Sequence, residues 1–521
     1  MKKTTRTAGL VAASAALLFS GLAVPSAASA AAPSLDWGAC VGGAPAPDPR
    51  QRCATVEVPM DYSDPGAGTV DLVVSRIPSE NPAERRGVLL LIPGGPGNSS
   101  LNDPSGRGQK LPQDVRDAYD LIGFAPRGLA PSTAVSCGLA YEDLAVTRVA
   151  RPYPAPDGSV DAAMSAARRM SEACARNGGE LIRHISTANE ARDLDRVRAA
   201  LGERKVSAWG VSYGTYAGAV YSRMFPHRTD RIVLDSNDDP DPRRVGRAWI
   251  AAHERGVEDT FPEFAAWASA PDSPVRLAGT PAGVRALFLR LADRLDREPI
   301  PWPNANPAEL NGNVLRQSML QTMYDPDGFE RLARLIDGAR DGRVPPVTAP
   351  SPQQVAGLQN SLAVGAGTLC NDIAWPRDAA VYEKGVAESR AAYPLTAGMP
   401  RNAMMCAAWP FEPQEPPVRI TDAGPSDILL IQNERDPATP LAGALRMRAA
   451  LGDRARMVTV DSTGHDAYLA NGNACGDATV TRFLATGERP ERDVYCGRGA
   501  VPPQPRGETA ASVTGRERSF V

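Results

Sequence analysis

Short apolar runs alternate with amphipathic stretches through residues 54–235. Residues 70–77 alternate apolar and polar side chains, which is typical of a strand with one buried face. The other predicted strands are apolar runs of the kind found in buried parallel strands, at residues 88–92, 121–124, 206–209 and 231–234. The pattern therefore predicts several strands that belong to one buried sheet.

Helix signals separate these strands. Residues 187–201 form an amphipathic stretch that Gly202 ends, and Thr187 with Glu190 matches a capping box at its start. The small-residue segment 215–221 reads as a further helix. Alternating strands and helices are the signature of the α/β class, in which a mainly parallel sheet is flanked by helices.

The pattern changes between residues 240 and 417, where helix-like segments rich in Trp, Pro and acidic residues include no convincing buried strand. Strand signals return at 428–432 and 457–460, after a proline-rich linker at 410–417. We therefore predict a sheet domain in two parts, 31–239 and 418–498, with a large inserted helical cap domain at 240–417. Residues 499–521 are polar and rich in Pro and Gly, and we expect them to be disordered.

The first residues resemble an export signal. Lys2, Lys3 and Arg6 precede an apolar stretch at 8–24, and small residues end at Ala30. This pattern predicts a secretory signal peptide over residues 1–30, and its apolar part is too short for a comfortable membrane span. We expect a secreted, extracellular protein that has no membrane association after cleavage.

The chain has eight cysteines, which in an exported protein favour up to four disulfides. We hypothesise that neighbours in the sequence pair, as Cys40–Cys53, Cys137–Cys174, Cys370–Cys406 and Cys475–Cys496. No CxxC spacing or His cluster suggests a metal site, and we expect neither a metal nor a cofactor. The formal net charge of −3 argues against nucleic acid as the main partner.

Ser212 lies in the sequence GVSYG at residues 210–214, between a predicted strand and a predicted helix. A nucleophilic serine at such a turn needs a sparsely allowed backbone conformation, for which flanking glycines leave room. Because a chain with 47 Gly can match this pattern by chance, the prediction of a serine hydrolase depends on finding the partners of the serine.

A serine hydroxyl needs a general base, usually a histidine, and a carboxylate that orients it. When the serine occupies this kind of turn, the acid and then the histidine follow it in the chain, which removes His184. His227 lies in a polar turn and His253 lies in the predicted cap. His465 follows a late predicted strand, in a loop that would return over the serine, and is the predicted base.

The carboxylate should come from the loop after strand 428–432. Asp436 is well placed there because Pro437 fixes the turn, and Glu434 is the runner-up. The oxyanion of the intermediate needs two N–H donors. We predict Tyr213 as one and the glycine-rich loop 93–97, through Gly94 or Gly95, as the other.

With these residues the chain resembles the secreted bacterial tripeptidyl aminopeptidases, a branch of the proline iminopeptidase family of α/β-hydrolases. The resemblance rests on residues 93–97 (PGGPG), 123–128 (GFAPRG), 210–215 (GVSYGT), 233–235 (VLD), 370–372 (CND), 406–410 (CAAWP), 436–440 (DPATP) and 464–465 (GH). The chain departs from proline iminopeptidases at Pro93, where they usually have His, and from the wider family at Ala125, where Asp is common.

The resemblance implies an α/β-hydrolase fold and an exopeptidase that releases short peptides, tripeptides in this branch, from free N-termini of peptides or proteins. Such an enzyme needs a buried anionic group for the substrate ammonium, and a cap that blocks longer N-terminal extensions. Asp372 in the predicted cap is the first candidate for the amine-binding group, and Asp239 with its neighbour Asp238 at the cap entrance is the second.

Three other functions fit the same residues. A secreted esterase or lipase uses the same triad, although the polar, acidic cap argues mildly against a lipase. A proline or other single-residue aminopeptidase is a further alternative within the family. A hydrolase fold that only binds other molecules is the least favoured, because all three triad candidates are present.

Overall fold

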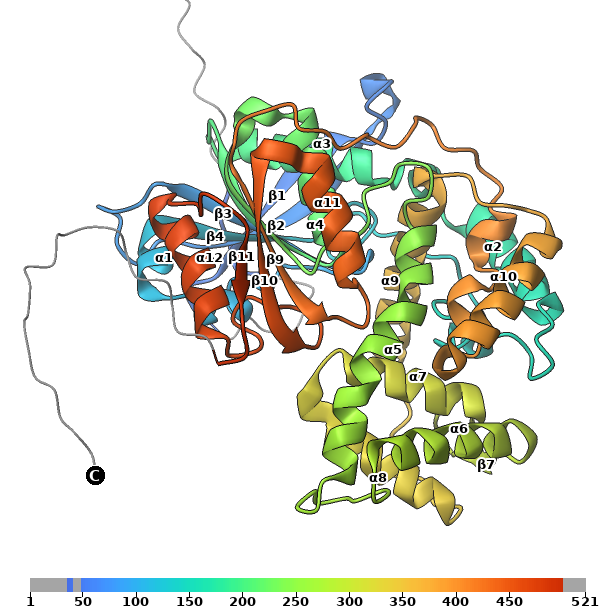
Figure 1. Ribbon diagram of the computed structural model, residues 1–521. Coiled ribbons are helices and arrows are strands. Elements are labelled where there is room, and N and C mark those ends of the chain that lie inside the picture. The colour runs from blue at the N-terminus through green and yellow to red at the C-terminus, as the bar shows by residue number, and fades with distance from the viewer. Residues whose placement is uncertain (1–34, 41–47, 500–521) are drawn as a thin grey trace, which may run out of the picture.

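The computed structural model describes residues 35–40 and 48–499, so the predicted signal peptide and the predicted tail beyond Gly499 lie outside the described residues. A nine-stranded sheet has the order β1-β2-β4-β3-β5-β6-β9-β10-β11 (Figure 1). Within this sheet, the β1–β2 and β2–β4 pairings are antiparallel and the pairings between the other neighbouring strands are parallel. The strands are β1 Arg52–Pro59, β2 Thr69–Ile77, β3 Gly87–Ile92, β4 Tyr119–Phe124, β5 Val206–Val211, β6 Thr229–Asp235, β9 Ile428–Arg435, β10 Ala455–Thr463 and β11 Val494–Cys496.

Helices cover both faces of this sheet, which is why its central strands are buried and mostly apolar. Strands β3, β4 and β5 are buried along their whole length. One face packs against α3 (Thr187–Ala200), α4 (Tyr213–Met224) and α11 (Leu441–Leu451). The other packs against α1 (Gln113–Ala118) and α12 (Ala474–Thr486). The predicted α/β class and its mainly parallel, helix-flanked sheet are confirmed.

The predicted strands and helices are present within a few residues of their expected ends, but the predicted capping box is wrong. Ser186 is the N-cap of α3, and its side chain accepts a hydrogen bond from the N–H of Asn189. Thr187 is already helical, and its N–H donates to Asp372 at 2.8 Å. Glu190 instead accepts a hydrogen bond from the Tyr213 hydroxyl at 2.8 Å. Strands β1 and β11 were not predicted individually.

Six helices, which we call the cap helices, lie between β6 and β9 in the sequence and form a body beside the sheet (Figure 1). They are α5 Arg247–Ser269, α6 Pro281–Arg297, α7 Gly312–Met323, α8 Phe329–Arg340, α9 Pro352–Asp372 and α10 Ala379–Ala392, with a short β7–β8 ladder between α6 and α7 (Ile300–Pro301 and Glu309–Leu310). Helices α5 to α8 share a hydrophobic cluster of their own.

One helix from the first part of the chain joins the cap helices. Helix α2 (Asp161–Asn177) lies beside α10 in Figure 1. Met164 of α2 belongs to the same hydrophobic cluster as Tyr382 and Val386 of α10. The helical body is therefore assembled from two separate stretches of the chain, and α2 was not among the predicted elements.

A buried ion pair holds the loop that follows β4. Arg127 is 1% exposed, and its guanidinium donates to both carboxylate oxygens of Asp193 on α3, at 2.6 and 2.7 Å. Arg127 also donates to the backbone carbonyls of Met60 and His184 at 2.9 and 3.1 Å. Removing one partner of such a pair typically costs about 3–5 kcal/mol. This pairing fixes the loop although Ala125 stands where the family often has Asp.

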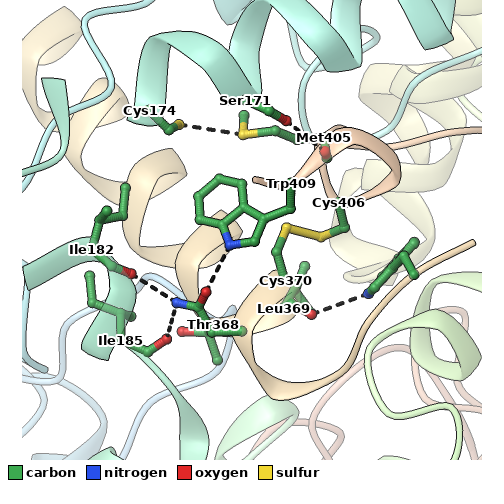
Figure 2. The surroundings of a disulfide bond; sticks show 12 residues. Ser171, Cys174, Ile182, Ile185, Thr368, Leu369, Cys370, Met405, Cys406 and Trp409 are labelled. Carbon is green, nitrogen blue, oxygen red and sulfur yellow. Dashed lines mark hydrogen bonds between the residues drawn. A yellow bond between two sulfur atoms is a disulfide. The ribbon is translucent and has the colours of Figure 1, made fainter. Parts of the chain in front are cut away.

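Four disulfides join the eight cysteines in the pairs that the sequence suggested. The Cys370–Cys406 bond links the end of α9 to the segment Met405–Ala408 (Figure 2). Next to it, Trp409 donates to the Asn371 side chain at 2.7 Å, and Asn371 in turn donates to the carbonyl of Ile182 at 2.8 Å (Figure 2). The disulfide and this network tie α9 to the chain around α2.

Within the described part of the chain, no helix combines the length and the apolar character needed to cross a bilayer.

Candidate active site

Ser212 occupies the turn between β5 and α4, with φ 57° and ψ −126°, a backbone conformation that non-glycine residues rarely adopt. A Cβ atom on Gly210 would lie 2.3 Å from the carbonyl oxygen of Gly214, and one on Gly214 would lie 2.6 Å from that of Ile92. Only glycine fits at either position. The turn therefore holds Ser212 at the carboxyl edge of the sheet, as the GVSYG sequence predicted.

The glycine-rich loop after β3 lies against this turn. A Cβ atom on Gly94 would lie 3.0 Å from the Cβ and 3.5 Å from the Oγ of Ser212. Gly95 has φ 116° and lines the cavity beside the serine. Tyr213 begins α4, so its N–H is one of the helix-start donors that have no intrahelical acceptor. The backbones of Gly94, Gly95 and Tyr213 thus lie at the serine.

Asp436 and His465 lie together although they come from two different loops. The Nδ1 atom of His465 is 3.0 Å from each carboxylate oxygen of Asp436. Asp436 also accepts hydrogen bonds from the N–H groups of Ala438 and Thr439 at 2.8 Å each, and from the Thr439 hydroxyl at 2.9 Å. These donors fix the carboxylate that orients the imidazole. Glu434, the runner-up, contacts Arg435 instead and stays half-buried.

The two groups shift each other's pKa in opposite directions. Burial acts to lower the pKa of His465, but the charge and hydrogen bond of Asp436 outweigh it, and the net pKa lies well above the usual 6.5. Burial acts to raise the pKa of Asp436, while His465 and the donors from Thr439 and Ala438 bring it below its ordinary value. The geometry therefore favours a carboxylate beside an imidazole that readily holds a second proton.

The loop that carries His465 is anchored to the strand after the serine. Asp235, at the end of β6, accepts the N–H groups of Ala467 at 2.8 Å and Tyr468 at 3.0 Å. Ser236 has φ 62° and its hydroxyl accepts the N–H of Asp466 at 3.0 Å. Burial, followed by the nearby charge of Asp466, raises the pKa of Asp235 to about 7. The two N–H donors act in the opposite direction, because they stabilise the charged carboxylate. The sequence VLD at 233–235 was noted for its family resemblance, and this is its structural role.

A partly enclosed cavity with a volume of about 140 Å³ opens beside Ser212. Most of its wall is apolar and comes from the cap helices and the segment after them. The lining includes Trp249, Ile250, Leu362, Leu369, Met404 and Met405. Thr439 and Tyr324 line it too, and their side chains contact Asp436 and His465 respectively.

The cap helices and their connections touch three of the loops that form the site. Ser361 on α9 donates to the carbonyl of Gly97 at 2.7 Å, and a Cβ atom on Gly97 would lie 2.4 Å from the Ser361 carbonyl oxygen. A Cβ atom on Gly256 of α5 would likewise lie 2.4 Å from the carbonyl oxygen of Pro437. The N–H of His465 donates to the carbonyl of Tyr324, after α7, at 2.8 Å. The helical body therefore helps to position the reacting groups.

The structure does not bring the two leading candidates for amine binding to this cavity. Asp372 binds the N–H and hydroxyl of Thr187 at the start of α3, and it lines a separate, smaller pocket. Asp239 forms ion pairs with Arg244 at 3.1 Å and Arg446 at 2.9 Å and faces another pocket. Both carboxylates already have partners within the protein, so the prediction that they meet the substrate is corrected.

Asp238, which the sequence offered only as a neighbour of Asp239, lines the cavity together with Ser212. It is 4% exposed, and no basic side chain among the described residues forms an ion pair with it. Burial is the main cause that raises its pKa to about 8, and the nearby charges of Asp436 and Asp239 raise it further against the opposing effect of His465. A carboxyl group in this state gains from binding a cation.

His227 lies in an exposed turn after α4, and His184 lies buried beside Glu180. In the described residues there is no group of three or more His, Cys, Asp or Glu side chains that could hold a metal ion. His253 and Tyr324 line the cavity, and the sequence offered no signal for their role there.

Comparison with known proteins agrees with this geometry. Residues 393–496, which include Asp436 and His465, match the family described as TAP-like protein. The chain is 33% identical to a tripeptidyl aminopeptidase of Streptomyces lividans over 91% of its own length and 89% of the relative. It is 27% identical to serine protease Hip1 of Mycobacterium tuberculosis, over 85% of this chain and 87% of that protein.

A protein of Mycobacterium tuberculosis named carboxylesterase B is 28% identical, over 85% of this chain and 86% of that protein. The similarity to the Streptomyces enzyme extends over almost the whole chain, sheet and helical body alike. The chain therefore belongs to the tripeptidyl aminopeptidase family and is a serine peptidase with an α/β-hydrolase fold.

Proposed function

We propose that this serine exopeptidase is secreted and releases tripeptides from the free N-termini of peptides and proteins through an acyl-enzyme intermediate. The observation that carries the proposal is the position of Asp238, a buried carboxyl group without a basic partner in the cavity that also contains Ser212. A free substrate ammonium supplies the missing positive charge. The names of the Streptomyces and Mycobacterium relatives support the same reading.

In the proposed reaction, the Oγ of Ser212 attacks the carbonyl carbon of the third residue while Nε2 of His465 takes the hydroxyl proton. The oxyanion accepts hydrogen bonds from the N–H of Tyr213 and from the loop of Gly94 and Gly95. His465 then donates the proton to the departing amine, and the C–N bond breaks. Water, deprotonated by His465, hydrolyses the acyl-enzyme and releases the tripeptide. Asp436 orients the imidazole throughout.

Asp238 gives the proposed enzyme its requirement for a free N-terminus. With a pKa of about 8, the empty site is largely protonated at neutral pH, and a bound ammonium stabilises the ionised form. An N-acetylated peptide offers no such charge. The walls of the cavity that contains both residues limit the length of peptide that can lie between Asp238 and Ser212.

Export is proposed on two further observations. All eight cysteines form disulfides, which persist in oxidising compartments. The first 30 residues have the pattern of a signal peptide. Extracellular peptides and protein N-termini are then the substrates available to the enzyme.

A second candidate function is an esterase. The same three groups cleave esters, and one relative with 28% identity is named carboxylesterase B. An esterase does not need a buried carboxyl group in its site. The two functions therefore differ in whether a free amine on the substrate raises its rate of hydrolysis.

Hydrolysis of chromogenic anilides separates these functions. We expect wild type to cleave free-amine tripeptidyl anilides well, mono- and dipeptidyl anilides poorly, and N-acetylated tripeptides at least 10-fold more slowly. Ser212→Ala should lower turnover by about 10⁶-fold, to the limit of detection. Equal rates for free and acetylated substrates, with faster cleavage of simple acyl esters, would favour the esterase. Preference for a single residue would indicate a different aminopeptidase.

Replacing Asp238 tests the amine site separately. We expect Asp238→Asn to lower kcat/KM for free-amine tripeptides roughly 100-fold, because the ammonium loses its charged partner. Cleavage of N-acetylated substrates should change little. Asp239→Asn, which alters the adjacent carboxyl group outside the cavity, is the matched control and should retain the preference for a free amine. An equal loss for both kinds of substrate in Asp238→Asn would contradict this assignment.

The pH dependence follows from the raised pKa of His465. The reaction needs the neutral imidazole, so kcat/KM for an N-acetylated or ester substrate should rise with pH through a pKa above 6.5. Asp436→Asn removes the carboxylate that raises this pKa. The variant should therefore have a lower apparent pKa together with a kcat reduced by about 10⁴-fold. An unchanged midpoint in the variant would argue against Asp436 as the partner.

A further inference from the structure

Arg151 introduces a positive charge into the wall of the catalytic cavity. Its backbone is fixed, since its N–H donates to the carbonyl of Val146 at 2.8 Å. Its side chain is half-buried and lines the same cavity as Ser212 and Asp238. The proposed chemistry at Ser212 does not use this guanidinium.

A neutral histidine holds the guanidinium of Arg151. The Nδ1 atom of His253 lies 3.1 Å from the carbonyl oxygen of Trp249 and 3.2 Å from that of Ile250, so Nδ1 carries the proton. Its Nε2 atom is then an acceptor, 3.1 Å from the Tyr324 hydroxyl and 3.4 Å from Nη2 of Arg151. Burial, followed by the charge of Arg151, lowers the pKa of His253 to about 3 and keeps the ring neutral.

No carboxylate in the described structure forms an ion pair with Arg151. Its other hydrogen bond goes to the carbonyl of Ala150 at 2.9 Å. By contrast, Arg316 and Arg401, which also belong to the helical body, pair with Asp296 at 2.9 Å and with Glu254. The cavity wall around Arg151 is largely apolar, and an unpaired charge in such surroundings attracts a counter-ion more strongly than it would in water.

Asp238 does not neutralise Arg151. Both residues line the cavity, but they form no ion pair, and the charges that shift the pKa of Asp238 are those of His465, Asp436 and Asp239. The cavity therefore contains the guanidinium of Arg151 and, separately, a carboxyl group that becomes negatively charged when a cation binds beside it. A planar guanidinium with free N–H groups is suited to a carboxylate, which it can bind through two parallel hydrogen bonds.

We propose that Arg151 is a specificity-determining residue that binds a carboxylate of the substrate, with His253 as the residue that positions it. This inference rests on the proposed exopeptidase function and adds a substrate class to it, namely acidic peptides. The carboxylate has two possible sources with the same chemistry. It is either an Asp or Glu side chain of the peptide, or the free C-terminus of a short peptide.

Matched substrates distinguish the two sources. The first set consists of free-amine tripeptidyl anilides with Glu or Gln at each of the three positions in turn. The second consists of tetrapeptides and pentapeptides with a free or an amidated C-terminus. We expect wild type to prefer the carboxylate member of one of these pairs by roughly 10- to 100-fold in kcat/KM, the range typical of a charged hydrogen-bonded contact.

Arg151→Gln should abolish that preference and leave kcat/KM for the neutral members within about twofold. Arg151→Lys keeps the charge without the planar fork and should retain part of the preference, which also guards against loss of folding in the Gln variant. Arg148→Gln, an exposed arginine in the same segment, is the matched control and should behave as wild type.

A preference for the carboxylate that survives in Arg151→Gln would overturn the inference. So would an equal loss of activity on neutral and acidic substrates, because that result indicates a structural role. The neutral substrates test the proposed function independently. If wild type fails to cleave any neutral free-amine tripeptide but cleaves neutral esters, the exopeptidase proposal fails. Glutamyl and glutaminyl esters then test Arg151, because a preference for the glutamyl ester should still be lost in Arg151→Gln.

Discussion

The closely packed backbone around Ser212 is the constraint on which the site depends. The turn between β5 and α4 keeps a non-glycine residue at φ 57°, and it does so because Gly210 and Gly214 let the chain approach itself and β3 to distances that exclude any side chain. Strand β5, which pairs with β3 and β6, fixes the start of the turn, and α4 begins at its end. The energetic cost of the strained serine is therefore met by the packing of the whole sheet.

The same principle of close backbone contact joins the helical body to the site. Glycines at 97, 256 and 464 allow cap elements to lie directly on the loops that hold the glycine-rich segment, Asp436 and His465. Between these contacts lies a cavity with a largely apolar wall, which also contains the carboxyl group of Asp238 and the guanidinium of Arg151. Neither residue forms an ion pair with another described residue. Leaving charged groups unpaired in such a place is costly, and a ligand that bears both charges removes the cost. Specificity and stability thus oppose each other at these two residues.

Much of the sheet was predictable because each strand depends on local sequence, and the structure brings two members of the proposed triad, Asp436 and His465, into contact. Residues 206–214 encode strand, turn and nucleophile together, and the order of Ser212, Asp436 and His465 along the chain limited the choice of partners. The capping box failed because Ser186, one residue earlier, satisfies the helix start, while a carboxylate distant in sequence, Asp372, binds Thr187. Local patterns do not reveal such tertiary partners.

The sequence could not separate the candidate amine-binding carboxyl groups for the same reason. The sequence does not distinguish the carboxyl groups of Asp238, Asp239 and Asp372. In the structure Asp239 pairs with Arg446, Asp372 binds Thr187, and Asp238 faces the cavity. Nothing in the sequence indicated that Arg151 and His253 belong to the cavity, because the two side chains meet only through a contact between residues 102 positions apart. Side-chain partners across the fold decide these functions.

The most direct test of the account is to trap the acyl-enzyme. Wild type is mixed with a long, free-amine peptide, quenched with acid within milliseconds to seconds, digested and mapped by mass spectrometry. The account predicts that the fragment containing Ser212 carries the mass of the first three residues of the substrate. Turnover without any adduct on Ser212, or an adduct on a different residue, would contradict the central claim. That claim is that Ser212 attacks the carbonyl carbon of the third residue from the free N-terminus.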